Sequence, residues 1–155
     1  MARIFAFLAV IMWGAALQAD DIGARDGWIV MPSDKAFDVL LDDLKSAVRA
    51  NKMGVVTQAG PTGAAANRGI TIPNNRIVGV FNNVYAVRIL GLSTAAMIEA
   101  PIRFYLTEDA DGAASLSYKT PSFVFSPYVA EGGSDLVTAA AELDAIFLAI
   151  AEAAR

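Results

Sequence analysis

The chain has 155 residues, of which 55% are hydrophobic and 18% charged, and its formal net charge is −4. This composition is too apolar for a disordered chain and provides enough apolar surface for the core of one ordinary domain. The acidic balance argues against binding to nucleic acid or to anionic membranes, because both favour clustered lysine and arginine.

The sequence contains neither cysteine nor histidine. Their absence excludes disulfides, thiol chemistry, zinc or haem sites built on these ligands, and every catalytic triad that uses histidine. Any metal would have to be a hard ion held by oxygen atoms, such as calcium or magnesium. We therefore expect a protein without a cofactor.

Residues 1–19 have the layout of a secretory signal peptide. Arg3 supplies a positive charge, residues 4–16 form an apolar run of about 13 residues, and the small residue Ala19 precedes an acidic pair. The run is shorter than the roughly 20 residues that a membrane-spanning helix needs. We expect cleavage after Ala19, a periplasmic or secreted location, and a single domain over residues 20–155 without stable membrane insertion. An uncleaved anchor is the alternative.

The first half of this domain predicts a strand, a helix and a second strand. Residues 28–31 form a short apolar strand, and Ser33 is a good N-cap for a helix that runs to Ala50. Apolar residues recur in that helix at helical spacing and predict its buried face: Phe37, Leu40, Leu41, Leu44 and Val48. A second strand begins at residue 55, and a turn at 60–63 precedes one helical turn.

The second half predicts three more strands. Residues 76–81 are apolar and β-branched, which is typical of a central strand buried on both faces. Residues 102–106 and 114–118 alternate apolar and polar side chains, and the tight turn at 108–112 joins them as a hairpin. Gly112 suits the left-handed position of that turn.

Three further segments complete the prediction. Residues 82–100 are expected to be irregular, with a short helix at 93–98, and residues 123–133 to form an aromatic loop. A final helix over residues 134–154 buries one apolar face: Leu136, Ala140, Leu143, Phe147 and Ile150. The element order is β-α-β4-α, an α+β fold with a twisted, mainly antiparallel sheet packed against the two long helices.

Four short motifs in the middle and at the end of the chain form a recognisable set. They are Ile77–Phe81 followed by two asparagines, Pro101–Leu106, Glu108–Gly112 and Ser117–Pro121. This set resembles the bacterial domain-of-unknown-function family 302 over residues 37–150. The resemblance implies a small β-α-β4-α domain, similar in fold to half of the TATA-box-binding protein and often dimeric, and it brings no assigned reaction.

The chain departs from the family pattern at two places. The family's Phe-Gly-Asn-Pro is Phe81-Asn82-Asn83-Val84 here, and Gln58-Ala59-Gly60 replaces its Asp-His pair after the second strand. Any activity that depends on those residues elsewhere in the family is expected to be lost or altered in this chain.

Two groups of acidic residues have the composition of a metal site. Asp34, Asp38 and Asp42 lie at helical spacing, but basic residues follow them along the same predicted helix, as the helix dipole favours. Asp109 and Asp111 resemble the start of a calcium loop, but the glutamate that closes such a loop is missing. We interpret the first group as a solvated helix face and the second as a hairpin turn.

A local excess of positive charge marks the candidate ligand site. Between residues 52 and 107 the chain has five lysines and arginines and one acid. The candidate site lies where strand 76–81 meets the irregular segment and comprises Asn82, Asn83, Tyr85, Arg88 and Arg103. Arginine binds carboxylate or phosphate in a bidentate manner. The alternative is that these arginines lie on separate exposed faces and pair with surplus acids.

These features predict a non-catalytic binding module for a small anionic or polar ligand. A structural protein that acts as a homodimer, through sheet edges or the aromatic loop, is the first alternative. A cofactor-free enzyme that uses carboxylates, tyrosine and arginine is the second, although the sequence lacks histidine, cysteine and a convergent pair of acids.

Overall fold

The computed structural model describes residues 22–155. The expected signal peptide and its cleavage after Ala19 lie outside the described residues. Within residues 22–155, no helix has the length and apolar character needed to cross a membrane.

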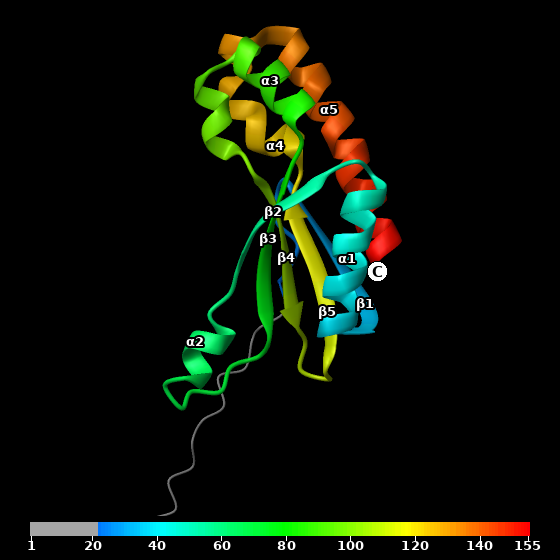
Figure 1. The fold of residues 1–155 in the computed structure, drawn as a ribbon. Coiled ribbons are helices and arrows are strands. Elements are labelled where there is room, and N and C mark those ends of the chain that lie inside the picture. Colours follow the sequence, from blue (N-terminus) through cyan, green and yellow to red (C-terminus); the bar gives the residue numbers. More distant parts are fainter. Residues whose placement is uncertain (1–21) are drawn as a thin grey trace, which may run out of the picture.

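Five strands form one antiparallel sheet in the order β1-β5-β4-β3-β2 (Figure 1). Their bounds are β1 (Trp28–Ala36), β2 (Gly54–Ala59), β3 (Asn75–Phe81), β4 (Ile102–Glu108) and β5 (Ala113–Lys119). The predicted α+β class is therefore confirmed, and β3 is an internal strand as expected.

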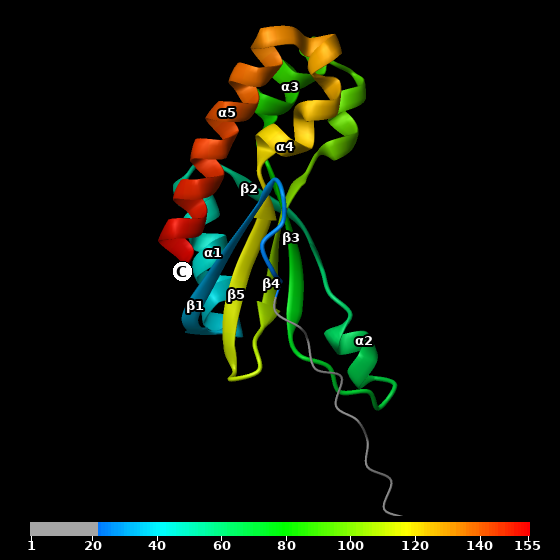
Figure 2. The same cartoon turned by 180° about the vertical axis from the view of Figure 1, so that it is seen from behind.

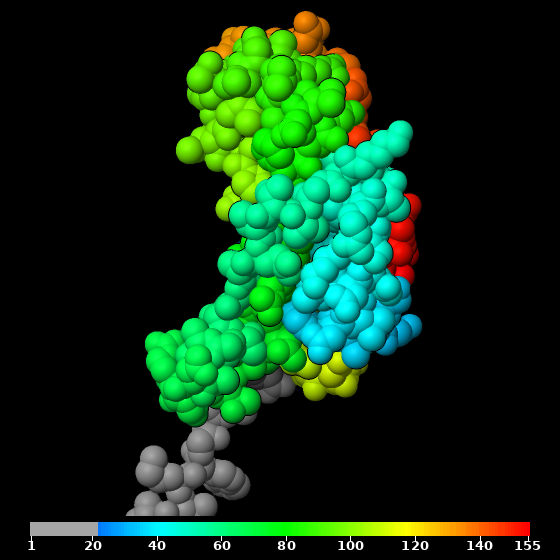
Figure 3. Space-filling model, viewed as in Figure 1, coloured from blue at the N-terminus to red at the C-terminus, as the bar shows by residue number. Residues whose placement is uncertain are grey.

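The helices cover one face and one end of this sheet. They are α1 (Phe37–Ala50), α2 (Thr62–Ala66), α3 (Asn83–Leu92), α4 (Pro121–Phe125) and α5 (Val129–Ala154), with short 3-10 turns η1 (Ala95–Glu99) and η2 (Ser126–Tyr128). The helix α1 and the second half of α5 lie on one face, whereas α3, α4 and the start of α5 gather beyond one end of the sheet as a helical lobe (Figure 1). The short helix α2 projects at the opposite end (Figure 3).

The hydrophobic core lies between the sheet and the helices α1 and α5. The ring of Phe104 in β4 stacks on Phe147 of α5 with centroids 4.8 Å apart, and Tyr118 of β5 meets Phe104 edge-on at 5.1 Å. Leu40 of α1 is fully buried against the same cluster. The two predicted apolar stripes, on α1 and α5, are the faces that the structure buries.

The helix α1 begins at Phe37, so the predicted start at Ser33 is wrong. Residues 32–36 extend β1 instead, because Pro32 and Ser33 pair with Ser115 and Ala114 of β5. The residue before the helix is Ala36, which has extended backbone and no side-chain capping bond. Strand pairing therefore determined the conformation of Ser33, although serine is a good helix cap. Asp34 belongs to the strand and not to the predicted helix face.

Two segments expected to be irregular are helical. Asn82 caps α3: its Oδ1 accepts the backbone N–H groups of Val84 at 2.8 Å and Tyr85 at 3.2 Å. Thr120 caps α4 in the same way, with proline in the first helical turn. In the expected aromatic loop only Gly133, with φ of +60°, interrupts the helical path, so the regular part of α5 begins close to the predicted residue 134.

One expectation about β3 is also wrong. Val78 and Val80 are buried, but Ile77 on the other face is 39% exposed. Burial of the strand is therefore complete on one face only, since on the other face Gly79 is buried but Ile77 is not.

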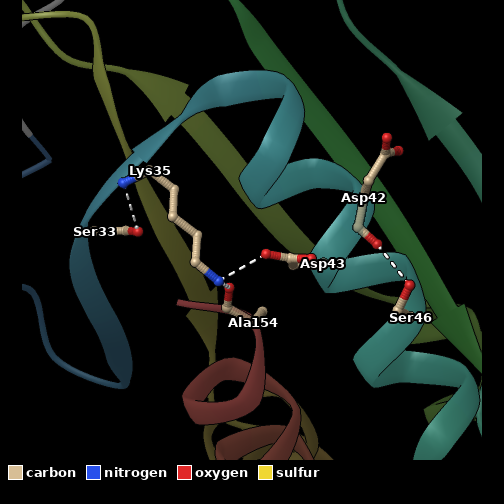
Figure 4. A network of polar contacts seen from close by, with 6 residues as sticks. All are labelled: Ser33, Lys35, Asp42, Asp43, Ser46 and Ala154. Atoms are coloured by element: carbon tan, nitrogen blue, oxygen red, sulfur yellow. Dashed lines mark hydrogen bonds and ion pairs between the residues drawn. The ribbon is translucent and has the colours of Figure 1, made fainter.

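Polar contacts of one lysine join β1, α1 and α5 (Figure 4). The Nζ of Lys35 in β1 donates to the Oδ2 of Asp43 in α1 at 2.7 Å and to the carbonyl oxygen of Ala154 in α5, also at 2.7 Å. A lysine at a helix C-terminus meets the negative end of its dipole. Asp42 pairs with Lys45 at 3.1 Å. Asp42 and Asp43 thus make ordinary surface ion pairs.

Candidate functional site

The candidate site lies on the face of the sheet that α1 and α5 leave uncovered. Figure 2 shows this open face, with α4 above it and α2 at its lower side. Strand alternation turns Phe104 and Tyr118 toward the core and therefore turns Arg103, Tyr105 and Lys119 toward the open face. Trp28 of β1 joins them, because it is the cross-strand partner of Lys119.

A cavity of about 470 Å³ opens on this face. Strands β1, β3, β4 and β5 supply its floor, while Pro61 before α2, Glu99 of η1 and Val124 of α4 line its edges. A cavity in this size range is typical of sites for small organic molecules, which occupy about 300–1,000 Å³. The residues of this floor include Trp28, Ile77, Arg103, Tyr105 and Lys119.

Two cations lie side by side on the floor of this cavity. Phe104 is opposite Tyr118, so continuing the antiparallel register by one residue places Arg103 opposite Lys119. Among the residues that the structure describes, neither cation forms an ion pair. Like charges directly opposite each other on paired strands are destabilising. The arrangement therefore favours a bound anion between them.

Trp28 brings a third cation to the same place. The guanidinium of Arg25 and the ammonium of Lys119 each lie 5.6 Å from the centroid of its ring. Such cation–π contacts hold a positive charge near an aromatic surface without neutralising it. Among residues 22–155, Glu99 is the one acid that lines the cavity, and its carboxylate accepts a hydrogen bond from the hydroxyl of Tyr128 at 2.8 Å. The cavity is thus locally positive within an acidic protein.

The structure places Arg103 apart from the other four residues of the sequence-predicted site. Asn82 and Tyr85 line a second cavity, of only about 30 Å³, on the other side of β4. This is the volume of about one water molecule. Asn83 is exposed at the first turn of α3.

Arg88 and Tyr85 both bind Glu142, which holds α3 against α5. The Nη1 of Arg88 donates to the Oε2 of Glu142 at 2.7 Å, and the hydroxyl of Tyr85 donates to the same oxygen at 3.1 Å. The bond from Arg88 holds the pKa of Glu142 below its usual value. Burial, followed by the bond to Glu142, raises the pKa of Tyr85. In this structure the charge of Arg88 is thus neutralised within the molecule.

Sequence reasoning missed Trp28 and Lys119 as site residues. The predicted hairpin at 108–112 carried the signal for Lys119, because its register already places residue 119 beside residue 103. No local pattern indicates Trp28, which reaches the site only because β1 pairs with β5.

The described residues, 22–155, contain no group of three or more His, Cys, Asp or Glu side chains that could hold a metal ion. The cavity presents the side chains of Arg103 and Lys119, which are of the types that bind anions in proteins, and aromatic and aliphatic surface.

Comparison with known proteins agrees with this fold. The family model described as "Domain of unknown function DUF302" matches residues 29–152, which is most of the chain. The chain belongs to the DUF302 family. The resemblance inferred from the four sequence motifs is thereby confirmed. No curated protein matches the chain.

A solved structure of another DUF302 protein has the same fold. It is described as "Crystal structure of uncharacterized conserved protein DUF302 from Bacillus stearothermophilus", with a TM-score of 0.74 and 15% sequence identity, and the match covers 84% of this chain and all of that one. At this identity the likeness shows the shared fold alone. The function of this DUF302 domain must therefore be argued from its own residues.

Proposed function

We propose that this domain is a non-catalytic binding module for a small organic anion, held in the cavity on the open face of the sheet. The observation that carries the proposal is the cross-strand pair Arg103 and Lys119 on the cavity floor, which forms no ion pair with any described carboxylate. An anion between them removes their mutual repulsion. Arginine offers a bidentate fork and lysine a point charge, which suits a carboxylate or a phosphate.

The test is a search for bound small molecules by mass spectrometry of the undenatured protein, followed by calorimetric titration with carboxylates and phosphates. We expect binding by the unaltered protein, and at least a tenfold loss in Arg103→Gln and in Lys119→Gln. Arg68→Gln is the matched control, because Arg68 is exposed beyond α2 and does not line the cavity. Equal binding by all three variants would place the ligand elsewhere, and the absence of any anion binding would refute the proposal.

We further propose that the protein is exported and cleaved after Ala19. The charge, apolar length and small residue of residues 1–19 support this proposal. Protein recovered outside the cytoplasm should begin with Asp20. An intact Met1 in a membrane fraction would instead support the uncleaved anchor.

A second candidate function is self-association as a homodimer, which the surface of the helical lobe favours. Val84 and Val87 of α3 are 76% and 72% exposed, and Ile98 of η1 is 79% exposed. Arg88 on the same helix is neutralised by Glu142. Val84, Val87 and Ile98 therefore expose apolar surface beside a neutralised arginine, which suits contact with a second copy of the protein.

Analytical ultracentrifugation tests this second candidate. We expect Val87→Asp to shift the protein from dimer to monomer. The matched control is Val39→Asp, because Val39 of α1 is also exposed, at 51%, but lies far from the helical lobe along the sheet face. A dimer that survives Val87→Asp would use another surface, and an unaltered protein that is monomeric at all concentrations would exclude the candidate.

A further inference from the structure

The open face carries its two cations and its aliphatic side chain in different rows. One row contains Arg103 and Lys119, with Trp28 as the cross-strand partner of Lys119. The next row, two residues further along each strand, contains Tyr105 paired with Ile77 of β3 on one side and with Ser117 of β5 on the other. Two residues of a strand span about 7 Å. The cavity therefore has a cationic end and an apolar side separated by about the length of a short carbon chain.

The second row exposes apolar surface at Ile77. This residue lies on β3, between β2 and β4, is 39% exposed and lines the cavity together with Tyr105 and Val124. An inorganic anion at the cationic end would leave this apolar surface in water. The cavity volume of about 470 Å³ also exceeds the needs of such an ion, since a water molecule occupies about 30 Å³.

We propose that the ligand is an amphipathic anion, with a carboxylate or phosphate at one end and an apolar body at the other. Its charged end binds between Arg103 and Lys119, and its body lies over Tyr105 and Ile77. This inference rests on the proposed anion-binding function and adds the class of ligand. Burial of the apolar body supplies affinity that increases with its length, whereas the cation pair selects the sign of the charge.

A homologous series of ligands tests the inference. Calorimetry and the fluorescence of Trp28 would follow titrations with acetate, butanoate, hexanoate and octanoate, and with inorganic phosphate and hexyl phosphate. We expect affinity to rise about two- to fourfold per methylene until the cavity is filled. Octylammonium should bind at least tenfold more weakly than octanoate. The comparison of hexanoate with hexyl phosphate distinguishes the two possible charged groups.

Two substitutions separate the charged end from the apolar side. Ile77→Thr keeps a β-branched residue suited to the strand and should abolish most of the gain in affinity with chain length, with a much smaller effect on acetate and inorganic phosphate than on octanoate. Arg103→Gln should weaken every member of the series by the same factor. Val56→Thr is the matched control, since Val56 is exposed on β2 and does not line the cavity. Circular dichroism would verify that each variant is folded.

The outcomes distinguish this inference from the function on which it rests. Equal affinity for acetate and octanoate, or binding of octylammonium as tight as that of octanoate, would overturn the amphipathic ligand and leave an anion site. Chain-length dependence that persists in Ile77→Thr and is lost in Val56→Thr would overturn the assigned position. If no anion binds, both the function and its refinement fail.

Discussion

At the scale of single residues, the open face has a pair of like charges that lowers the stability of the sheet. The β4–β5 register, continued by one residue beyond Phe104 and Tyr118, places Arg103 opposite Lys119. Opposite like charges destabilise a sheet by a few tenths of a kcal/mol up to about 1 kcal/mol. Three other cations of the described residues do form ion pairs: Lys35 with Asp43, Lys45 with Asp42 and Arg88 with Glu142. Functional sites are where such local conflicts are expected.

Reversing one of these charges should separate stability from binding. Arg103→Glu places a carboxylate opposite Lys119 and should raise the free energy of unfolding by about 0.2–1 kcal/mol, while anion binding in the cavity is lost. Urea unfolding and calorimetry measure the two effects. Arg68→Glu, at an exposed position away from the cavity, should change neither. A loss of stability in Arg103→Glu would show that the two cations do not repel each other in the folded protein.

Tyr118 predicts how stability depends on alkaline pH. Burial, with smaller effects from Asp144 and Glu152, raises the pKa of Tyr118 from 10.0 to about 12. The unfolded chain therefore loses this proton first, so the stabilising effect is complete below pH 10 and is lost as the pH rises toward 12. Tyr118→Phe keeps the ring contacts with Phe104 and Phe147. Between pH 9 and 12 the free energy of unfolding should fall less steeply with pH in Tyr118→Phe than in the unaltered protein. Equal slopes in the two proteins would contradict the raised pKa of Tyr118.

At the scale of elements, capping explains why α3 forms where an irregular segment was expected. The Oδ1 of Asn82 accepts two backbone N–H groups of α3, and its Nδ2 donates to the carbonyl oxygen of Lys52 at 2.9 Å. The helix itself has a weak amphipathic pattern because apolar residues lie on all its sides, from buried Ile89 to exposed Val84 and Val87. Its periodicity was therefore hard to detect, whereas its cap was present in the sequence.

Adjacent asparagines allow a matched test of that cap. Asn82→Ala should lower the free energy of unfolding by about 1 kcal/mol, because two helix N–H groups lose their acceptor. Asn83→Ala should change it by less than about 0.5 kcal/mol, since Asn83 is exposed. Chemical denaturation measures both, and neither variant should alter anion binding on the open face. A loss of ligand in Asn82→Ala without unfolding would return the site to the start of α3.

At the scale of the whole molecule, the fold is one sheet with a core on one face and a cavity on the other. The helices α1 and α5 seal the core face, and the helical lobe and α2 extend beyond the two ends of the sheet (Figures 1 and 2). Residues from β1, β3, β4 and β5 together line the cavity on the open face. The site therefore depends on the integrity of the sheet, which the core on the opposite face supports.

Two buried side chains of the core are expected to contribute strongly to overall stability. Phe147 is 1% exposed and lies against both Phe104 and Tyr118, and Leu40 is fully buried. Phe147→Ala should lower the free energy of unfolding by about 3–5 kcal/mol and Leu40→Ala by about 2–5 kcal/mol. Leu148→Ala is the control, because Leu148 is 40% exposed on the same helix. Unchanged stability in both core variants would mean that other faces of α1 and α5 are buried.

The sequence by itself determined the elements whose signals are local. The alternation on either side of Gly112, with φ of +87°, defined the β4–β5 hairpin, and the helical spacing of apolar residues defined the buried faces of α1 and α5. Four short motifs were enough to recognise the family. Such features depend on residues close in sequence. They are therefore visible as a period of two in the strands and of 3.6 in the helices.

Only the tertiary structure decided the length of β1 and the composition of the site. Ser33 has the chemistry of a helix cap, yet pairing with Ala114, far along the chain, kept it in a strand. Arg103 was chosen from local charge, and the β4–β5 hairpin already brings Lys119 beside it, but Trp28 comes from β1, whose pairing with β5 no local pattern specifies. Strand order is set by long-range burial and hydrogen bonding, and these bring together residues that the sequence keeps about ninety positions apart.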